Sequence, residues 1–415
     1  ALPRTDRAGR DLRAGATLTQ LLPTGTRLSV GYEGVGDRST TDRPGGVSLP
    51  DSVSARAIDY RQNVQVRVEQ PLLQDFGLGV NRASVEIAKL QDASSRQDLK
   101  SAMIGTVTQT VIAYRAYVQA RERQAIARKS LTRAQQLLRL NRRLVEAGRM
   151  ASLDLVQGRT QVSRQQLALE EARTQLESAR LTLLEILDLN REAIVVPIDS
   201  LGVPDVSLDT DSLVRIALDR RPDYQRVQNA VGIAREDRRL ATNRRLWDVR
   251  LVGTYNRRPE GDRFHLPYRG DPFSVQGGWN VGLTVERTLG NPRREQRREQ
   301  SRLQAQIAGN RKTDLRQQIR IAVRDQVNTL RQRRRQLDLA REVRRLSARK
   351  LAVEEKKLDK GRSSNFQVVV FQNDLTRARQ RELQARIAYL NAVTRLDQLT
   401  GSTLRTWGIE LDALQ

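Results

Sequence analysis

Four stretches of the chain alternate apolar and polar residues with a period of two. They cover residues 27–33, 60–69, 247–256 and 273–286. A period of two is typical of a β-strand that has one apolar and one polar face. The residues that we expect on the apolar faces are Leu28, Val30, Tyr32, Val64, Val66, Trp247, Leu251, Val275, Trp279 and Val281.

These strands form two pairs, and each pair brackets a polar loop, at 37–58 and at 257–272. The stretches have 7 to 14 residues, close to the roughly 9–11 that a tilted strand needs to cross a bilayer. Four strands make a poor soluble sandwich, and lipid does not tolerate open sheet edges. The pattern therefore favours a membrane barrel that closes between chains, with the apolar faces toward lipid. A further extended stretch, 16–22, is either a lead-in strand or a lip outside the barrel.

Long helical patterns follow each strand pair. They run from 77 to 148 and from 293 to 360, and each is followed by a shorter return helix. The apolar stripe of the second long helix contains Ile319, Val323, Val327, Leu330 and Leu337. The first return helix carries Leu167, Leu176, Leu183 and Leu187 on its packing side, and short helices are expected at 208–220 and 222–246. Such long helices fit an antiparallel, coiled-coil-like wall.

The two halves of the chain repeat each other. Residues 144–157 and 357–370 share a Gly-Arg pair between two helical patterns, so each pair marks the tip of a helical hairpin. Gly148 and Gly361 suit the left-handed residue that ends a helix. Ser152 and Asn365 are suitable N-caps for the return helices. The repeat also predicts a helix like 222–246 ahead of the first strand, which residues 1–26 do not supply; either residues precede this numbering or the first half lacks that arm.

The composition limits the kinds of catalytic and metal sites that the chain can form. The chain has no cysteine and one histidine, His265, which excludes disulfides, thiolate catalysis and metal clusters of cysteine or histidine. No catalytic motif or phosphate-binding loop is present, so we expect no enzyme, no cofactor and no metal. The net charge of +25 suggests a polyanion partner, but the arginines are spread along helices among acidic residues. A solvated helix surface is the favoured interpretation, and arginines at 293–298 could also meet anionic lipid head groups.

Three motifs then suggest a family. They are Gln70-Pro71-Leu72-Leu73 after the second strand, residues 217–223 in mid-chain, and the two Gly-Arg tips. In this order, with the alternating strands, the chain resembles the TolC-like outer-membrane efflux proteins. The resemblance implies a mixed α and β, two-repeat outer-membrane efflux fold. Four β-strands per chain would complete a 12-stranded trimeric β-barrel, and long antiparallel helices would form a periplasmic α-helical tunnel.

The resemblance also implies a function. The chain would be the outer-membrane exit duct of a tripartite efflux or type I secretion system, through which small molecules or polypeptides pass passively. It would lie in the bacterial outer membrane with its helical part in the periplasm. Its implied partners are two further copies in a homotrimer, outer-membrane lipid, a periplasmic adaptor protein at the hairpin tips and, through it, an inner-membrane transporter. Nucleic acid is not expected.

The family pattern suggests site residues at the tips. Those expected to contact the adaptor are Gly148, Arg149, Ser152, Leu153, Gly361, Arg362, Ser363, Ser364 and Phe366. An acidic pair that narrows the tunnel in the family falls here on Gln367 and Val370, so the lumen is expected to carry arginine and prefer anions. The candidates for a constriction are Asp154, Gln367, Val370 and Asp374.

These elements divide the chain into segments. We expect a first strand pair at 1–76, a first hairpin at 77–196, a linker at 197–246, a second strand pair at 247–289, a second hairpin at 290–400 and a tail at 401–415. The alternative is a soluble basic coiled-coil scaffold that binds polyanions, with the strands as a small accessory sheet. A periplasmic adaptor would show one hairpin, and the presence of two argues against it.

Overall fold

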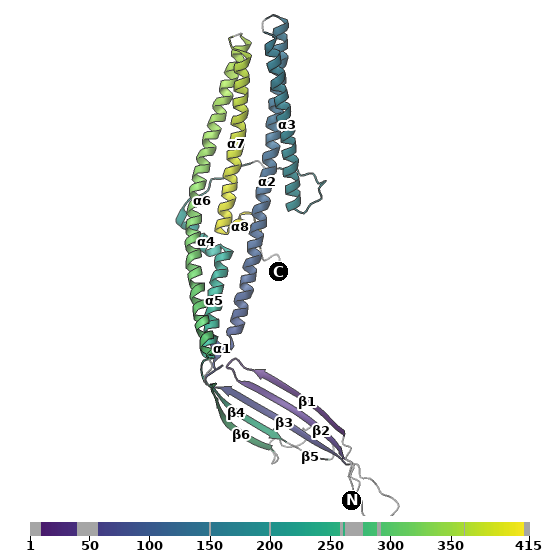
Figure 1. Ribbon diagram of the computed structural model, residues 1–415, viewed down its shortest axis with the longest axis vertical. Helices are drawn as coiled ribbons and strands as arrows, with labels where there is room; N and C mark the ends of the chain where they lie inside the picture. The colour runs from purple at the N-terminus through teal and green to yellow at the C-terminus, as the bar shows by residue number, and fades with distance from the viewer. Residues whose placement is uncertain are drawn as a thin grey trace, which may run out of the picture. The chain divides into compact units, whose positions relative to one another are not determined.

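The computed structural model describes residues 10–39, 57–148, 151–198, 201–257, 260–261, 277–288, 292–360 and 362–410. Contacts divide the chain into two compact units. One consists of Ala1–Asp92 and Asn229–Asn310, and the other of Ala93–Gln228 and Arg311–Gln415. The first unit holds the sheet and, in residues 83–92 and 293–310, the beginnings of the two long helices, and the second holds the rest of the helical hairpins (Figure 1).

The sheet is antiparallel, with the strand order β1-β2-β3-β4-β6. Its long strands are β1 (Arg10–Leu21), β2 (Arg27–Ser39), β3 (Ala57–Pro71), β4 (Asp248–Arg257) and β6 (Gly277–Glu286). A short strand, β5 (Glu260–Gly261), pairs with β3. The four predicted strands are present as β2, β3, β4 and β6, although residues 273–276 and most of both loops lie outside the described residues. The stretch 16–22, whose place the sequence left open, lies in β1 up to Leu21 and is therefore part of the sheet.

A tight turn joins β1 to β2. The Gly25 N–H donates to the Leu22 carbonyl at 2.9 Å, and the Leu22 N–H donates to Thr26 at 2.8 Å. Gly25 has a φ of 94°, and a side chain there would collide with the carbonyl oxygen of Asp75. The Gly77 N–H donates to the Thr24 carbonyl at 3.1 Å, which ties the turn to the segment that follows β3.

The place where the repeat predicts a helix is therefore occupied by a strand. In the second half, α5 (Pro222–Asn243) leads into β4 as expected, whereas β1 leads into β2. The described residues ahead of β2 form a strand and a turn and no helix, which agrees with the sequence, since residues 1–26 carry no such helical pattern. Residues 10–21 instead pair along β2, from Arg10 opposite Arg38 to Leu21 opposite Arg27, and this ladder satisfies their main chain as a strand.

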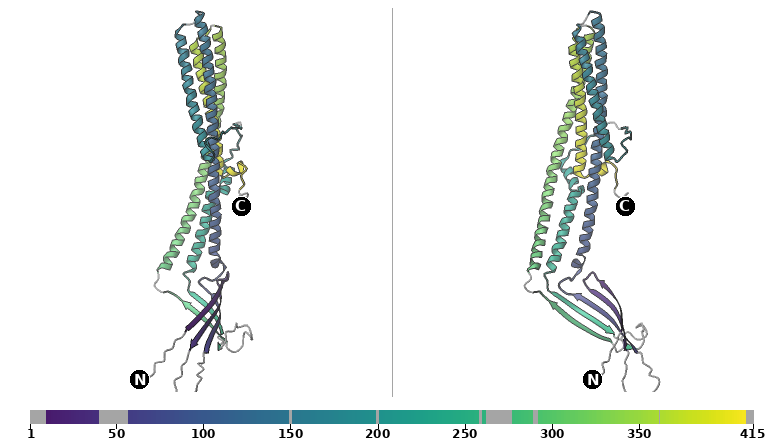
Figure 2. Two further views of the ribbon diagram at one scale, coloured as in Figure 1. Left: turned by 90° about the vertical axis from the view of Figure 1, so that its right-hand side faces the viewer. Right: turned by 45° about the vertical axis from the view of Figure 1, so that its right-hand side comes forward.

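The helices form the two predicted hairpins. The first consists of α2 (Ala83–Glu146) and α3 (Leu153–Ile186), and the second of α6 (Arg293–Asp359) and α7 (Asn365–Thr400). Short helices complete the set: α1 (Leu78–Asn81), α4 (Thr210–Arg220) and α8 (Thr403–Thr406). In the helical unit, α7 and α2 lie between α6 and α3 (Figures 1 and 2).

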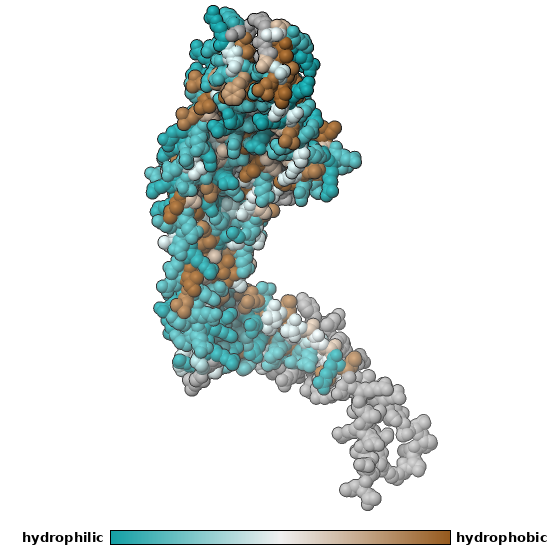
Figure 3. Space-filling model, turned by 45° about the horizontal axis from the view of Figure 1, so that its top comes forward, coloured by the Kyte–Doolittle hydropathy of each residue, from teal (hydrophilic) through white to brown (hydrophobic). Residues whose placement is uncertain are grey.

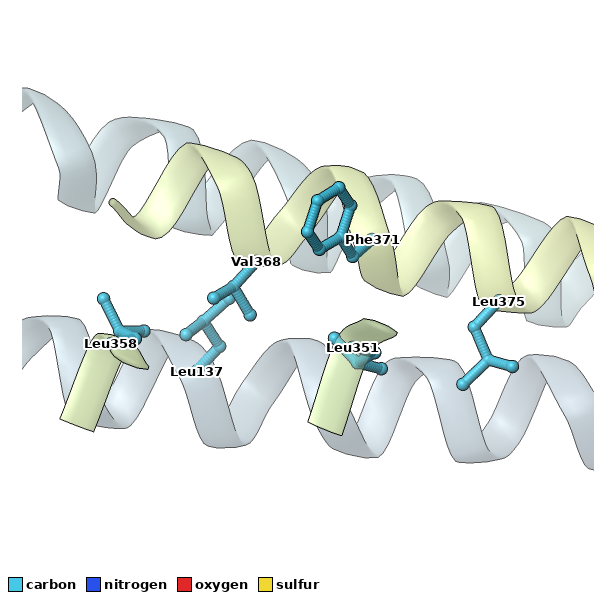
Figure 4. Close-up of a cluster of buried hydrophobic side chains, with 6 residues drawn as sticks. All are labelled: Leu137, Leu351, Leu358, Val368, Phe371 and Leu375. Carbon is cyan, nitrogen blue, oxygen red and sulfur yellow. The ribbon is translucent and has the colours of Figure 1, made fainter. Parts of the chain in front are cut away.

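The helical unit has narrow cores along its helix contacts. All five apolar residues predicted for α6 are at most 1% exposed. Near the tips, Leu137 of α2 packs with two leucines of α6 and three side chains of α7, which are Leu351, Leu358, Val368, Phe371 and Leu375 (Figure 4). The first hairpin therefore packs directly on the second.

Polar contacts reinforce this packing. The Arg115 guanidinium of α2 donates to the Leu390 carbonyl at 2.6 Å and to the Thr394 hydroxyl at 2.7 Å on α7. Burial lowers the pKa of Arg115, and the nearby Asp397 carboxylate opposes this shift. Ser130 of α2 lies 3.0 Å from the hydroxyl of Thr376. These contacts fix how α2 and α7 are aligned lengthwise.

One prediction about α3 is wrong. Leu176 and Leu183 pack against α2 as expected, but Leu167 is 63% exposed, and Leu187, which caps the end of the helix, is 41% exposed. Leu169 and Ala172 are buried instead, at 6% and 7% exposed. The helix carries two apolar stripes, and the one that includes Leu167 faces away from α2.

Gly401 provides a test of the end of α7. It has a φ of 68°, and a Cβ there would lie 2.8 Å from the Arg220 carbonyl oxygen. We expect Gly401→Ala to lower the free energy of unfolding by about 1–3 kcal/mol, because alanine is strained in this conformation. Chemical unfolding followed by circular dichroism measures the change.

Gly105→Ala is the matched control. Gly105 lies inside α2, and a Cβ there meets no atom within 4 Å. Alanine is the better helix former, so this variant should be more stable by up to about 1 kcal/mol. Equal effects of the two substitutions would contradict the left-handed cap.

Candidate membrane face and hairpin tips

The strand register gathers the predicted apolar residues on one face of the sheet. Residues directly opposite one another in an antiparallel ladder share a face. One rung of the sheet contains Leu18, Val30, Val66, Tyr255 and Trp279. The same face holds the other predicted residues of the described strands, which are Leu28, Tyr32, Val64, Leu251 and Val281. Trp279 is 79% exposed and Val281 63%, so nothing in the described chain covers this part of the face.

Two residues of the predicted apolar set, Trp247 and Val275, lie outside the paired strands that the structure describes. Trp247 directly precedes β4, and the Arg287 guanidinium lies 4.7 Å from the centroid of its ring. An aromatic ring beside a cation at a strand end is typical of a membrane interface. Val275 lies outside the described residues.

The opposite face of the sheet is polar. Its rungs include Thr17, Gly31, Gln65 and Asn256 in one row. The Glu69 carboxylate accepts hydrogen bonds from Arg67 at 2.9 Å and from Arg27 at 3.5 Å. A second set joins Arg250 to Asp248 at 2.9 Å and to Glu286 at 3.6 Å. The sheet therefore has one apolar and one charged surface, and contact of the former with lipid stays a prediction.

The first hairpin tip ends in a left-handed glycine. Gly148 has a φ of 69°, as predicted, and its N–H donates to the Val145 carbonyl at 2.9 Å. Arg149 lies outside the described residues. Ser152 precedes α3, but its hydroxyl makes no capping hydrogen bond. Leu153 is 66% exposed, and Asp154 lies in the first turn of α3.

The second tip is held by side-chain contacts. Gly361 lies outside the described residues, and the Arg362 N–H donates to the Lys357 carbonyl at 2.8 Å. The Ser363 hydroxyl donates to Glu354 at 2.7 Å, and this hydrogen bond lowers the pKa of that carboxyl below its ordinary value. Phe366 is 64% exposed at the start of α7. Each tip thus presents an exposed apolar side chain in the first turn of its return helix.

The N-cap of α7 is Ser364, one residue before the predicted Asn365. The Ser364 hydroxyl accepts a hydrogen bond from the Gln367 N–H at 3.2 Å. Asn365 is the first helical residue and is 3% exposed, and its side-chain amide has no hydrogen-bond partner in the described part of the chain. The prediction of Asn365 as the cap is therefore wrong, because two capping residues are adjacent and the helix starts at the first of them.

The constriction candidates lie near the tips. Asp374 forms an ion pair with Arg377 at 2.7 Å, and Val370 is partly buried against the cluster of Figure 4. The side chains of Gln367 and Asp154 are partly exposed. Their role in a constriction stays a prediction.

Sequence patterns alone did not lead us to two exposed seams on the helices. On α3, Leu153, Leu167 and Leu181 are 66%, 63% and 40% exposed, and threonines at 160 and 174 continue their spacing. On α6, the seam contains Leu339, Leu346 and Val353, at 68%, 52% and 49% exposed. A spacing of seven residues is the signature of a helix that packs on another helix. This regular spacing was the signal that could have revealed both seams.

The hydropathy of the helical surface agrees with separate apolar seams on a polar background. Figure 3 shows a mostly hydrophilic helical surface with separate apolar patches, some of them near the hairpin ends. Among the helices that the structure describes, none has the length and apolar character to cross a membrane. In the same residues, no group of three or more His, Cys, Asp or Glu side chains is placed to hold a metal ion.

Comparisons with known proteins agree with this fold. The sequence profile described as "Outer membrane efflux protein" matches residues 28–188 and 213–402. The fold is similar to the outer membrane protein VceC from Vibrio cholerae, with 15% identity, a TM-score of 0.62, and coverage of 95% of this chain and 87% of VceC. It is also similar to the open state of the MtrE outer membrane channel from Neisseria gonorrhoeae, with 17% identity, a TM-score of 0.62, and coverage of 92% and 81%. No curated protein matches the sequence.

A sheet with opposed faces, combined with two long helical hairpins, defines an outer-membrane duct. The profile match covers most of the chain, and the chain belongs to the outer membrane efflux protein family. It is accordingly a transport channel and not an enzyme. Its place is the bacterial outer membrane, with the helical part in the periplasm.

The two tips make a matched test of helix capping. We expect Ser364→Ala to destabilise the first turn of α7 by about 0.5–2 kcal/mol, because it removes the cap of the Gln367 N–H. Ser152→Ala should change the first turn of α3 very little, since the Ser152 hydroxyl makes no such bond. Amide hydrogen exchange of both first turns measures the difference, and equal losses at the two tips would contradict this assignment.

Proposed function

We propose that three copies of the chain form the exit duct of a tripartite efflux or type I secretion system. Small molecules or polypeptides pass through a barrel and a helical tunnel to the cell exterior. Passage through the duct is passive, because the chain is a channel and not an enzyme. A transporter in the inner membrane supplies the energy.

The separation of faces in the sheet carries this proposal. The rung from Leu18 to Trp279 is apolar on every strand, whereas the adjacent row from Thr17 to Asn256 is uncharged and polar or glycine. Lipid on one side and water on the other is the environment that suits such a sheet. An open sheet has two edge strands, and in hydrocarbon only pairing between copies satisfies the N–H and C=O groups of the barrel edges.

The exposed seams favour a ring of copies. The part of α6 in the helical unit is strongly basic, whereas α3 has nearly equal numbers of acidic and basic residues. Two α6 seams would repel each other, so α6 of one copy is expected to pair with α3 of the next. A contact between two different surfaces generates a closed ring when its rotation closes.

The hairpin tips are proposed to contact a periplasmic adaptor. Leu153 and Phe366 are exposed at the two tips, and Arg362 lies next to the second. Exposed apolar side chains with a polar rim are typical of a protein interface. Arg149 and Gly361 belong to the same proposed contact.

The alternative of a soluble scaffold for polyanions rests on the net charge. Many arginines are already paired on their own helix, as Arg298 is with Glu295 at 2.5 Å and Arg345 with Glu342 at 2.6 Å. Such pairs use up part of the basic surface that nucleic acid would need. The exposed apolar rung of the sheet also has no role in that alternative.

Adjacent residues on opposite faces of β3 test the duct. We expect Val66→Arg to weaken membrane insertion by about 2–4 kcal/mol if Val66 meets the bilayer centre. Gln65→Arg should insert normally, because Gln65 lies on the polar face. Folding into lipid vesicles measures insertion, and planar-bilayer conductance then reports the pore.

The control variant adds a second readout. Gln65→Arg puts a positive charge on the presumed lumen side, so the channel should become more selective for anions. A chain that stays monodisperse without detergent and tolerates both arginines equally would support the soluble scaffold instead.

The seam on α3 provides a test of assembly. Leu167→Arg places a charge on the seam opposite a basic helix, so we expect the mass distribution to shift from trimer toward monomer. Gln166→Arg, at an exposed position off the seam, should leave the trimer intact. Native mass spectrometry in detergent compares the two, and an unchanged trimer for Leu167→Arg would exclude this seam from the interface.

A further inference from the structure

The edge strand β1 is held almost entirely by its main chain. Its ladder with β2 runs over twelve register pairs, from Arg10 opposite Arg38 to Leu21 opposite Arg27. The Thr19 hydroxyl lies 3.2 Å from that of Ser29 and reinforces the ladder. All side chains from 12 to 21 are exposed, with Leu12 at 76% and Leu18 at 75%. A different strand could therefore replace β1 by offering an equivalent set of main-chain hydrogen bonds.

The direction of the strands makes β1 incompatible with a regular barrel. In the antiparallel order β1-β2-β3-β4-β6, the two edge strands β1 and β6 run in the same direction. Closing β6 of one copy on β1 of the next would thus create a parallel pair at every junction. Three copies of these five strands would also give an odd total, whereas bacterial barrels have an even number of antiparallel strands. Without β1, the edges β2 and β6 run in opposite directions and close as an antiparallel pair.

β1 also lies outside the internal repeat. The strand pair β2–β3 corresponds to β4–β6, but the element that leads into β4 is the helix α5. The unit that is duplicated therefore begins with β2. An uncovered β2 edge would be a template for aggregation before assembly, and edge strands are commonly protected from this.

We propose that β1 is a guard strand that covers the β2 edge in the single chain and gives this edge to β6 of the next copy during assembly. The inference rests on the trimeric duct proposed above. The turn at residues 22–26 is fixed by the Gly77–Thr24 hydrogen bond and by the close fit of Gly25. The strand therefore separates from its Arg10 end, while the turn stays in place.

The exchange preserves the two faces of the sheet. Ser29 and Gly31 lie on the polar face of β2, and Asn280, Gly282 and Thr284 lie on the polar face of β6. An antiparallel pair that sets these residues side by side keeps the apolar residues of both strands on the lipid side. A shift by one residue would reverse one strand, so the register is restricted to alternate positions.

Disulfide trapping tests the exchange, because residues 1–415 contain no cysteine. The first variant combines Thr19→Cys with Ser29→Cys, which locks β1 on β2 within one chain. The second set combines Ser29→Cys with Asn280→Cys, Gly282→Cys or Thr284→Cys in turn, which reports contact between β2 and β6 of different copies. Each variant is folded into lipid vesicles under oxidising and reducing conditions, and the cysteine-free chain is the control.

Three outcomes are distinguishable. We expect a disulfide between copies in at least one variant of the second set, and at least a tenfold loss of trimer and conductance when Thr19–Ser29 is locked, restored by reduction. Full trimer and conductance with the lock intact would overturn the guard strand. Absence of trimers from the cysteine-free chain would instead contradict the proposed function, whatever β1 does.

Deletion of residues 1–22 is the second measurement. A guard strand is dispensable for the finished pore, so the single-channel conductance of the shortened chain should equal that of the parent. The unassembled chain should aggregate several-fold more, because its β2 edge is open. A narrower or absent pore from a folded, trimeric deletion variant would show that β1 belongs to the barrel.

Discussion

The structure depends on one constraint, which is that a sheet in hydrocarbon cannot leave main-chain N–H and C=O groups without partners. The amphipathic sheet of this chain satisfies its inner strands through the ladders β1–β2, β2–β3, β3–β4 and β4–β6. Among the described residues, the outer edges of β1 and β6 have no partner strand within one chain. The apolar face and the open edges therefore act together: the face favours lipid, and lipid then requires that the edges be paired by other copies.

The helical unit meets a different requirement, because its helices are surrounded by water and satisfy their own main chain. Its cores are narrow, and apolar burial alone would allow long helices to slide along one another. Polar contacts between helices, such as Arg115 with Thr394 at 2.7 Å and Gln161 with Asn373 at 2.9 Å, oppose this. Buried polar contacts of this kind specify register more than they add stability.

The sequence predicted the elements that depend on local periodicity. The four alternating stretches are strands, the two Gly-Arg pairs lie between the helices of hairpins, and Gly148 is left-handed as its position required. It left open the place of residues 16–22, because pairing with β2 is a tertiary choice that alternation does not decide. The phase of α3 was wrong at Leu167, since two apolar stripes on one helix give no local sign of which one packs on α2. The cap of α7 was misplaced by one residue because Ser364 and Asn365 are both good capping residues.

The internal repeat connects the contacts within the chain to those proposed between copies. Within the chain, the halves meet where the second strand of the first repeat, β3, pairs with the first strand of the second repeat, β4. They meet again where the outgoing helix α2 packs on the return helix α7. The proposed junction between copies repeats both arrangements, with β6 beside β2 and α6 beside α3 of the next copy. A duplicated chain therefore needs only one kind of junction, used alternately within and between copies, and β1 is the long strand that has no place in that scheme.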